Sequence, residues 1–241
     1  LHGNRFGFRK IKQLSNDPLY GKEELLKRMR AFGYTSETLE FMLFPMVHDL
    51  RDPLGSMGND TVLASLSDNH RLIYDYFKQR FAQVSNPSID SIREKIVMSL
   101  ECYIGPEGNL LEPGEKHANR ILVENPILTN TAMYALKHLN YLNHRSKVID
   151  ITYTKEVGLN EKIDEICRAA EESVDNGIGF IVLSDRGMDE SRTPVSALMA
   201  CGAVHHHLVK SAKRSKAAIV VETGEAREVH HFCLLFGYGA D

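Results

Sequence analysis

The stretch KVIDITYT, Lys147–Thr154, decides the fold class of this chain. Its apolar and β-branched residues from Val148 to Thr154 predict a buried strand of a parallel sheet, because such strands are covered on both faces. A helix is expected next. Asn160 is a suitable N-cap, and apolar residues then recur at steps of three and four until Gly177 supplies the stop.

The alternation of strand and helix repeats toward the end of the chain. Further strands are predicted at Phe180–Leu183 and Ala217–Val221. Between them, Thr193 and Pro194 are predicted to supply the N-cap and first turn of a helix that continues from Val195 to Ala212.

A last helix is expected over Glu225–Phe236. Its predicted apolar side consists of Val229, Phe232, Cys233 and Phe236. Strands that alternate with helices of this length require right-handed crossovers and a parallel sheet. The sequence therefore predicts an α/β fold, either a barrel or a doubly wound layer. We favour a partial or degenerate TIM-barrel-like domain.

Residues 1–146 are predicted to be mainly helix and loop, in contrast to the β-α part at residues 147–241. Three helices are expected, at Lys22–Phe32 before Gly33, at Ser36–Phe44 before Pro45, and at Asn69–Val84 after Asp68. The Gly-, Pro- and Glu-rich stretch Gly105–Gly114 is predicted to be a loop.

Composition excludes several classes of protein. The net charge of -3 offers no basic surface for nucleic acid, and no stretch approaches the roughly 18 apolar residues of a membrane span. No Cys-x-x-Cys pair occurs, so reduced, buried thiols and a cytoplasmic location are expected. The cysteines are Cys102, Cys167, Cys201 and Cys233.

Both ends of the sequence favour a piece of a longer chain. Leu1 stands where an initiator methionine would be, and no signal peptide follows it. The sequence stops at Asp241, where the next strand of the alternating pattern is due. We therefore expect residues 1–241 to be one segment of a larger protein.

A small-residue stretch, PLGSMGNDT at Pro53–Thr61, lies between two helical segments. Glycine permits close backbone approach, and short polar side chains bond to their own turns. The stretch lacks the lysine and spacing of a Walker A phosphate loop, so a structural or domain-contact loop is the favoured interpretation. The candidate residues are Gly55, Ser56, Met57, Gly58, Asn59, Asp60 and Thr61.

Polar residues also follow two predicted strands, where parallel α/β folds place their sites. Asp185 and Arg186 follow one strand, and Glu222, Glu225 and Arg227 follow the next. For Glu222, Glu225 and Arg227 the favoured role is a satisfied salt-bridge network that holds loops or a partner domain, whereas Asp185 beside Arg186 fits loop ordering as well as catalysis. The alternative is an acid-base pair. It would join Glu222 to His230 or His231.

A run of three histidines, His205–His207, raises the question of a metal site. Consecutive residues on a helix diverge by about 100 degrees, so no more than two of the three can face one ion. His230 and His231 are the other adjacent histidines, and no His-x-x-x-His pair occurs in either predicted helix. Packing and hydrogen bonding at a domain boundary is the favoured interpretation, with zinc as the alternative.

Several long motifs together resemble the central domain of the glutamate synthase large subunit. They include PLGSMGNDT, YDYFKQRFAQVSNP within Leu72–Pro87, IDSIREKIVMSLE at Ile89–Glu101, GPEGNLLEP at Gly105–Pro113, LSDRG, GAVHHHL at Gly202–Leu208 and VETGEAREVHHF at Val221–Phe232. The resemblance covers nearly the whole chain. One departure is Val62, where proline is expected after the threonine.

The resemblance implies a parent enzyme with three parts. An amidotransferase domain releases ammonia from glutamine, and a barrel domain with FMN and an iron-sulfur cluster uses it to form glutamate from 2-oxoglutarate. Electrons come from a pyridine-nucleotide-oxidising subunit or ferredoxin. The central domain resembles a reduced FMN barrel, binds no flavin and helps to wall the ammonia tunnel.

We therefore expect a non-catalytic connecting segment, with Gly55–Thr61 as the best candidate for the tunnel-side loop. Asp185, Arg186, Glu222, Glu225, Arg227, His230 and His231 are further tunnel or interface candidates. No catalytic, cofactor or metal residue is assigned here. Two alternatives stay open: an autonomous flavin- or phosphate-binding barrel enzyme, and a metal-dependent hydrolase built on the histidines.

Overall fold

The computed structural model describes residues 20–51, 53, 63–68, 70–78, 89–109, 111, 112, 114–141 and 143–241. These residues fall into two compact units. In the described part, unit 1 comprises residues 89–223 and 228–241, and unit 2 comprises residues within 20–78 together with 224–227.

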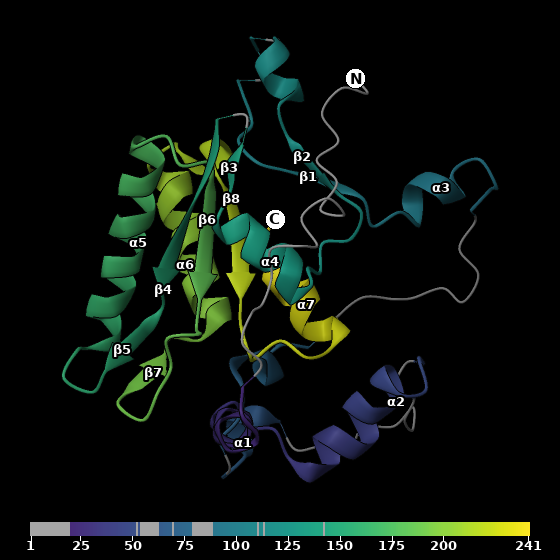
Figure 1. Ribbon diagram of the computed structural model, residues 1–241, viewed down its shortest axis with the longest axis vertical. Coiled ribbons are helices and arrows are strands. Elements are labelled where there is room, and N and C mark those ends of the chain that lie inside the picture. The colour runs from purple at the N-terminus through teal and green to yellow at the C-terminus, as the bar shows by residue number, and fades with distance from the viewer. Residues whose placement is uncertain are drawn as a thin grey trace. The chain divides into compact units, whose positions relative to one another are not determined.

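A four-stranded sheet lies at the centre of unit 1 (Figure 1). Its order is β3-β4-β6-β8, in which β3 is antiparallel to β4 and the other neighbours are parallel. The strands are β3 Asn140–Tyr141, β4 His144–Asp150, β6 Phe180–Ser184 and β8 Ala218–Glu222. The predicted strands at Phe180–Leu183 and Ala217–Val221 are therefore confirmed to within one residue.

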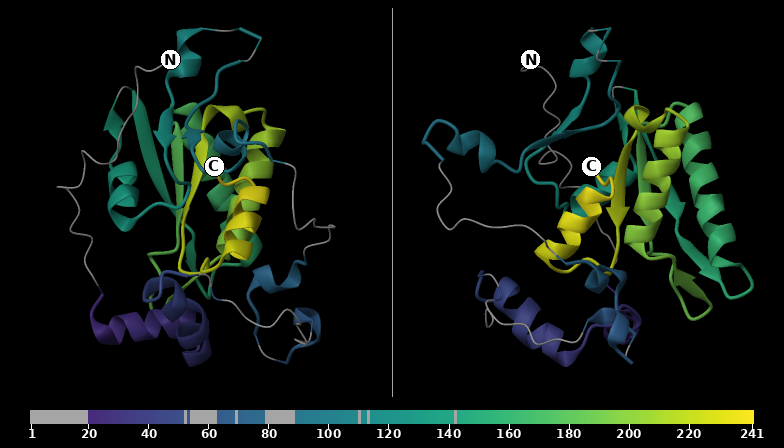
Figure 2. Two further views of the ribbon diagram at one scale, coloured as in Figure 1. Left: turned by 90° about the vertical axis from the view of Figure 1, so that its right-hand side faces the viewer. Right: turned by 180° about the vertical axis from the view of Figure 1, so that it is seen from behind.

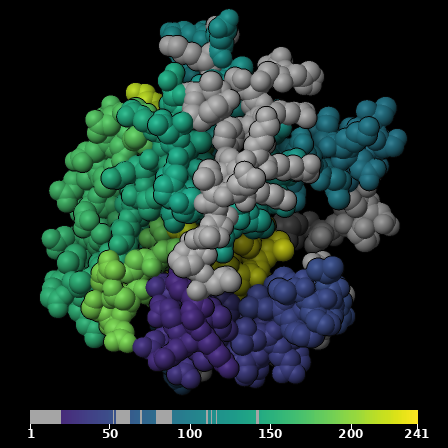
Figure 3. Space-filling model, viewed as in Figure 1, coloured from purple at the N-terminus to yellow at the C-terminus, as the bar shows by residue number. Residues whose placement is uncertain are grey.

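Three helices lie on one face of this sheet (Figure 2). They are α5 Leu159–Asp175, α6 Ala197–Lys210 and α7 Val229–Gly237. Helix α5 forms one side of unit 1 in the space-filling view (Figure 3). Its buried Ile166, Ala170 and Val174 recur at steps of four, as an amphipathic helix requires. Gly177 ends this region with a φ of 74°, a left-handed conformation that favours glycine.

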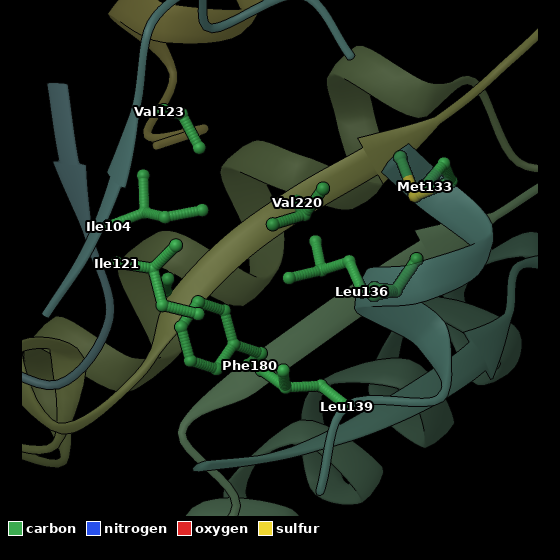
Figure 4. Packing of buried hydrophobic residues seen from close by; sticks show 10 residues of the cluster. Ile104, Ile121, Val123, Met133, Leu136, Leu139, Phe180 and Val220 are labelled. Atoms are coloured by element: carbon green, nitrogen blue, oxygen red, sulfur yellow. The ribbon is translucent and has the colours of Figure 1, made fainter. Parts of the chain in front are cut away.

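The opposite face of the sheet is covered by a hairpin and a short helix. The hairpin joins β1 Cys102–Ile104 to β2 Ile121–Val123, and the helix is α4 Asn130–Lys137, capped by the Thr129 hydroxyl. Together with the sheet they enclose one apolar core (Figure 4). Its buried members are Ile104, Ile121, Val123, Met133, Leu136, Leu139, Phe180, Val182, Ala218 and Val220.

Phe180 is the largest side chain of this core and is fully buried. Its ring lies 3.2 Å from the position that a Cβ on Gly105 would occupy. Gly105 also has a φ of 128°, which side chains rarely tolerate. The turn after β1 therefore needs glycine both for its backbone conformation and for the space that Phe180 takes.

The predicted strand over Val148–Thr154 is wrong in its extent. Strand β4 ends at Asp150, and Thr152–Thr154 form a separate strand, β5, antiparallel to β7 at Arg192–Pro194. Ile151 connects the two sheets, because its amide donates to Ser184 and its carbonyl accepts from Val195. Val148 is also 37% exposed, since the short β3 leaves much of β4 at a sheet edge.

Three predicted helix starts are also wrong. Gly158, rather than Asn160, is the N-cap of α5, and Ser196 is the N-cap of α6, because Thr193 and Pro194 belong to β7. Helix α7 begins at Val229 instead of Glu225. Capping side chains are common in loops, so they locate a helix start only to within a few residues.

The predicted apolar side of α7 is also wrong. His231 and Leu235 are the buried residues of this helix, whereas Val229, Cys233 and Phe236 are exposed. The expectation that all four cysteines are buried holds for Cys167 and Cys201 but fails at Cys233, which is exposed on α7, and at Cys102, which is half-buried on β1. His231 and Leu235 are four residues apart and therefore lie on the same, inward face of the helix. Because histidine is polar, a hydrophobicity pattern does not identify this face as the buried one.

Unit 2 is built from short helical segments. Helix α1 spans Lys22–Ala31 and is followed by Gly33 with a φ of 70°, as predicted. Pro45 does not end the next helical stretch, which continues without a break from the π-helix η2 (Thr38–Leu43) through Pro45 in α2 (Phe44–Val47), so the predicted end at Phe44 is wrong. The other segments are the π-helix η2 Thr38–Leu43, α2 Phe44–Val47, and the 3-10 helices η3 Ala64–Leu66 and η4 Ile73–Tyr76.

The helix predicted at Asn69–Val84 is wrong over its described part. Residues 70–78 contain only the single turn η4. The other residues of the predicted helix, 69 and 79–84, lie outside the described residues. Tyr74 is fully buried while Tyr76 is 55% exposed, which is not the stripe that a long helix would present. Aromatic and β-branched residues have low helix propensity, so tertiary contacts decide such a segment.

The strands of residues 89–141 and 143–241 form open sheets and not a closed barrel. The described part of residues 1–146 also contains β1, β2 and β3, which the prediction of mainly helix and loop missed. Its remaining short helices in unit 1 are α3 Glu94–Val97 and η5 Glu115–Ala118, with η6 Arg214–Lys216 further on. Among the described residues, no helix has the length and apolarity needed to cross a membrane.

Candidate functional site

Polar residues meet at the carboxyl ends of the parallel strands in unit 1. The register pairs Asp150 of β4 with Ser184 of β6, and Ser184 with Glu222 of β8. Because parallel strands end at the same edge of a sheet, these three residues lie side by side there. This edge is where sheets of this class position their functional groups.

Glu222 is the central group of this cluster. Its side chain is only 9% exposed, and both carboxylate oxygens accept from the Lys137 ammonium, at 3.1 and 3.0 Å. The Arg186 guanidinium lies 2.9 Å from Oε1, and the Ser184 hydroxyl donates to Oε2 at 2.5 Å. Charge-assisted bonds of this kind are stronger than neutral ones, so Glu222 is firmly held by two cations and a hydroxyl.

Helix α4 is tied to the strand ends at both of its termini. Asn130, its first residue, accepts from Arg186 at 3.3 Å, and Lys137, its last residue, binds Glu222. The Lys137 carbonyl also accepts from the Ser146 hydroxyl of β4 at 2.8 Å. The cluster therefore fixes a helix across three strands.

Asp185 joins the ends of β6 and β8. Its amide donates to the Glu222 carbonyl at 3.1 Å, and its carboxylate accepts from the Thr223 hydroxyl at 2.6 Å. Asp185 is buried, so these bonds replace the water that the carboxylate gives up. Its predicted neighbour Arg186 bonds to Glu222, as described above.

Asp150 completes the row at the β4 end. It accepts from the amide and hydroxyl of Thr152, and Arg192 approaches it at 3.4 Å. A Cβ on Gly187 would come within 2.6 Å of its carboxylate. The two-stranded sheet of β5 and β7 is thereby held to the end of β4, and a side chain at position 187 would have to displace the Asp150 carboxylate.

Glu225 and Arg227 belong to unit 2. Arg227 donates to the Phe32 carbonyl at 2.7 Å and to the Gly33 carbonyl at 3.3 Å, and its guanidinium lies 4.1 Å from the centre of the Tyr34 ring. The Tyr34 hydroxyl donates back to the Gly224 carbonyl at 3.0 Å. The guanidinium therefore neutralises the carbonyl end of α1 and fixes the turn that contains Arg227.

We expect Arg227→Lys to lower the free energy of unfolding of unit 2 by about 1 to 2 kcal/mol, since an ammonium replaces neither the two-carbonyl fork nor the ring stacking. Hydrogen exchange of the α1 amides measures this directly. Arg30→Lys, on the exposed side of the same helix, is the matched control and should change exchange little. Equal effects of the two substitutions would contradict the role given to Arg227.

The histidines do not assemble around one point. The His231 Nε2 atom lies 3.2 Å from Glu228, and the rings of His230 and His231 are 6.2 Å apart. His207 pairs with Glu171 of α5 at 2.7 Å. Lys213 donates to the same carboxylate. The hydrogen bond from Lys213, and to a smaller extent the one from His207, holds the pKa of Glu171 below its usual range.

His205 has a different partner. Arg214 donates from Nε to its Nδ1 atom at 3.0 Å, so this imidazole is a neutral acceptor. Burial lowers the pKa of His205, and the charge of Arg214 acts in the same direction. Across the described part of the chain, no three histidine, cysteine or acidic side chains come together in a way that could hold a metal ion.

The structure thus brings together Asp185, Arg186 and Glu222 in unit 1, whereas Glu225 and Arg227 are part of unit 2. Among the described residues, the partners of the Glu222 carboxylate are Lys137, Arg186 and Ser184, so the alternative acid-base pair with His230 or His231 is not formed. Sequence reasoning missed Lys137 and Asn130. Thr129 followed by apolar Met133 and Leu136 was the available signal of the helix that carries them. The candidate loop Gly55–Thr61 lies outside the described residues.

Comparison with known proteins gives the family of the chain. Residues 27–241 match the family described as glutamate synthase central domain. A glutamate synthase (NADH) of Schizosaccharomyces pombe is 51% identical over 220 residues, which is 89% of this chain and 10% of that protein. A glutamate synthase (NADH) of Saccharomyces cerevisiae is 47% identical over 233 residues, covering 95% of this chain and 11% of that protein.

A third relative is also a glutamate synthase that matches most of this chain. The glutamate synthase (NADPH) large chain of Bacillus subtilis is 44% identical over 233 residues, which is 95% of this chain and 15% of that protein. The chain therefore spans 10% to 15% of the length of these three relatives. The matched residues include the strands and helices of the site, and the chain belongs to the glutamate synthase central domain family.

Proposed function

We propose that this chain is the connecting domain of a glutamate synthase, between a glutamine amidotransferase domain and an FMN-binding synthase domain. The whole protein would form L-glutamate from L-glutamine and 2-oxoglutarate. Its FMN and iron-sulfur cluster would receive electrons from a pyridine-nucleotide-oxidising small subunit or ferredoxin. Support comes from the family and from relatives named as NADH, NADPH or ferredoxin-dependent glutamate synthases.

The state of Glu222 is the observation that carries the proposal of a non-catalytic role. A general base needs a lone pair that can reach a substrate proton, within about 3 Å or through one water. Here Lys137, Arg186 and Ser184 occupy the carboxylate oxygens. Such a group stabilises the arrangement of β6, β8 and α4, so the site acts as a brace and not as a reaction centre.

The cofactors of the parent enzyme are assigned to other domains. Iron-sulfur clusters need several cysteines around one centre. The four cysteines of this chain lie on β1, α5, α6 and α7, and burial raises the pKa of Cys201 to about 12, which keeps it a thiol. The described residues therefore do not fit the cluster.

We extend the proposal to the ammonia tunnel. Gly55–Thr61 is the candidate wall, since small side chains and backbone groups leave room for a small neutral molecule. This assignment rests on the sequence and on the resemblance. We also propose that the open sheet is related to a reduced FMN barrel. Superposition of this chain on the flavin domain, in a structure of the whole protein, would test that relation.

Thr61→Trp in the full-length enzyme is expected to leave glutaminase activity present and to reduce the glutamate formed per glutamine hydrolysed, because an indole would narrow the passage. The two products are measured in one assay, by glutamate and ammonia release. Thr61→Ser is the matched control and should keep the wild-type ratio. An unchanged ratio in Thr61→Trp would remove this loop from the tunnel.

A further inference from the structure

Strand β8 is the outer strand of the sheet among the described residues. Backbone groups of successive residues in a parallel strand point alternately to its two sides. The Ala218 amide donates to Gly179 and the Glu222 carbonyl accepts from Asp185, so the even-numbered residues face β6. Ile219 and Val221 therefore direct their amides and carbonyls to the outer edge.

The chain returns to this edge after α7. The Asp241 amide donates to the Ile219 carbonyl at 2.9 Å, and the Ile219 amide donates to the Asp241 carboxylate at 2.7 Å. Arg214 fixes the approach, because it donates to the Gly239 carbonyl at 2.9 Å and to the Asp241 carboxylate at 2.7 Å. The backbone at Asp241 thus already makes the first bond of a strand ladder with β8.

The crossover has the geometry of a parallel connection. Helix α7 packs against α6 on the same face of the sheet, and the chain then reaches the side of β8 away from β6. A strand, a helix and a return beside that strand form a βαβ unit, which is almost always right-handed and parallel. Among the described residues no strand pairs with the Val221 side of β8, and exposed strand edges are sites of unwanted association that proteins usually cover.

We propose that the residues directly following Asp241 in the longer protein form the next parallel strand of this sheet, on the outer edge of β8. The relatives are several times longer than this chain, which covers 10% to 15% of them. In this register Ala240 lies opposite Ile219, and the first residue past Asp241 lies opposite Val221. Val221 then donates to the Asp241 carbonyl and accepts from the second residue past it.

Addition of this strand makes β8 an internal strand. Glu222 then lies in the interior of the row of strand ends and no longer at its margin. The inference does not depend on the ammonia tunnel or on the connecting role, because it rests on the hydrogen-bonding geometry of one strand edge.

Cysteine cross-linking in the full-length chain tests the register. Val221→Cys combined with cysteine at the first position past Asp241 puts two side chains on the same face of neighbouring strands, within disulfide range. We expect an intrachain disulfide under mild oxidation, identified by peptide mass. Val220→Cys with the same partner is the matched control, because the Val220 side chain lies on the other face of the sheet, in the apolar core shown in Figure 4. This pair should cross-link at least about tenfold less.

Hydrogen exchange of the unmodified full-length chain gives a second readout, which does not depend on whether a cysteine variant folds. The Val221 amide should exchange within about tenfold of the Val220 amide, which faces β6. Faster exchange than this at Val221, equal cross-linking of the two cysteine pairs, or a disulfide that joins two separate chains would overturn the proposal.

Discussion

Replacing Glu222 with glutamine is expected to lower the free energy of unfolding of unit 1 by about 2 to 4 kcal/mol. The change removes the counter-charge of both Lys137 and Arg186 while keeping the shape of the side chain. Each carboxylate oxygen accepts from two of the surrounding donors, and the oxygen that becomes an NH2 group can no longer accept from Lys137 or from its second donor. Urea denaturation followed by circular dichroism measures the loss.

Glu165→Gln is the control for this experiment. Glu165 also pairs with a lysine, Lys162, at 2.9 Å, but its side chain is 58% exposed, and exposed pairs contribute roughly 0 to 1 kcal/mol. Lys137→Met in the Glu222→Gln background should cost less than the same change in the wild type, because the two groups interact. Equal effects of Glu222→Gln and Glu165→Gln would show that the cluster is not a brace.

Phe180→Ala is expected to lower the free energy of unfolding by about 3 to 5 kcal/mol, the range for deleting a buried aromatic side chain. Phe180 lies between the β1–β2 hairpin and α4, in contact with His144 at a ring distance of 5.5 Å. Gly105, whose backbone lies against the ring, has no side chain that could move into the cavity left behind. The same denaturation experiment measures this change.

Phe236→Ala provides the matched comparison on the same compact unit. Phe236 is 39% exposed on α7, so its removal from this chain should cost about 1 kcal/mol or less. A loss at Phe236 as large as that at Phe180 would mean that the core assigned here is not the main source of stability.

The central strands were predictable because each is an apolar run between turn residues. Phe180–Ser184 is buried at every position, and such a run has few alternatives to an inner strand. Helix α5 was predictable from its periodicity. Its start was not, since Gly158 caps it without a side-chain bond and Asn160 offered a better-looking signal.

The β5–β7 pairing and the inward face of α7 were not predictable from local pattern. Thr193 and Pro194 have the composition of a helix start, but Thr193 lies opposite Tyr153, and this long-range pairing decides their conformation. In α7 the buried His231 replaces an apolar residue on the inner face. Both misses come from contacts between residues far apart in the sequence.

The candidate site was predictable only in part. Asp185, Arg186 and Glu222 follow predicted strands, so their meeting at one sheet edge followed from parallel topology. Lys137 could not be placed with them, because its helix is short and joins the site through tertiary packing. Arg227 follows the same strand as Glu222, yet its guanidinium binds the carbonyls of Phe32 and Gly33.

The division into units has a consequence for any attempt to separate them. Residues 224–227 are flanked in the sequence on both sides by residues of unit 1 but belong to unit 2. A single cleavage of the chain therefore cannot yield two intact units. A truncated protein that begins at residue 80 would expose the Gly224 carbonyl and the Arg227 guanidinium to water. Isolated expression of unit 1 therefore needs a redesigned turn between β8 and α7.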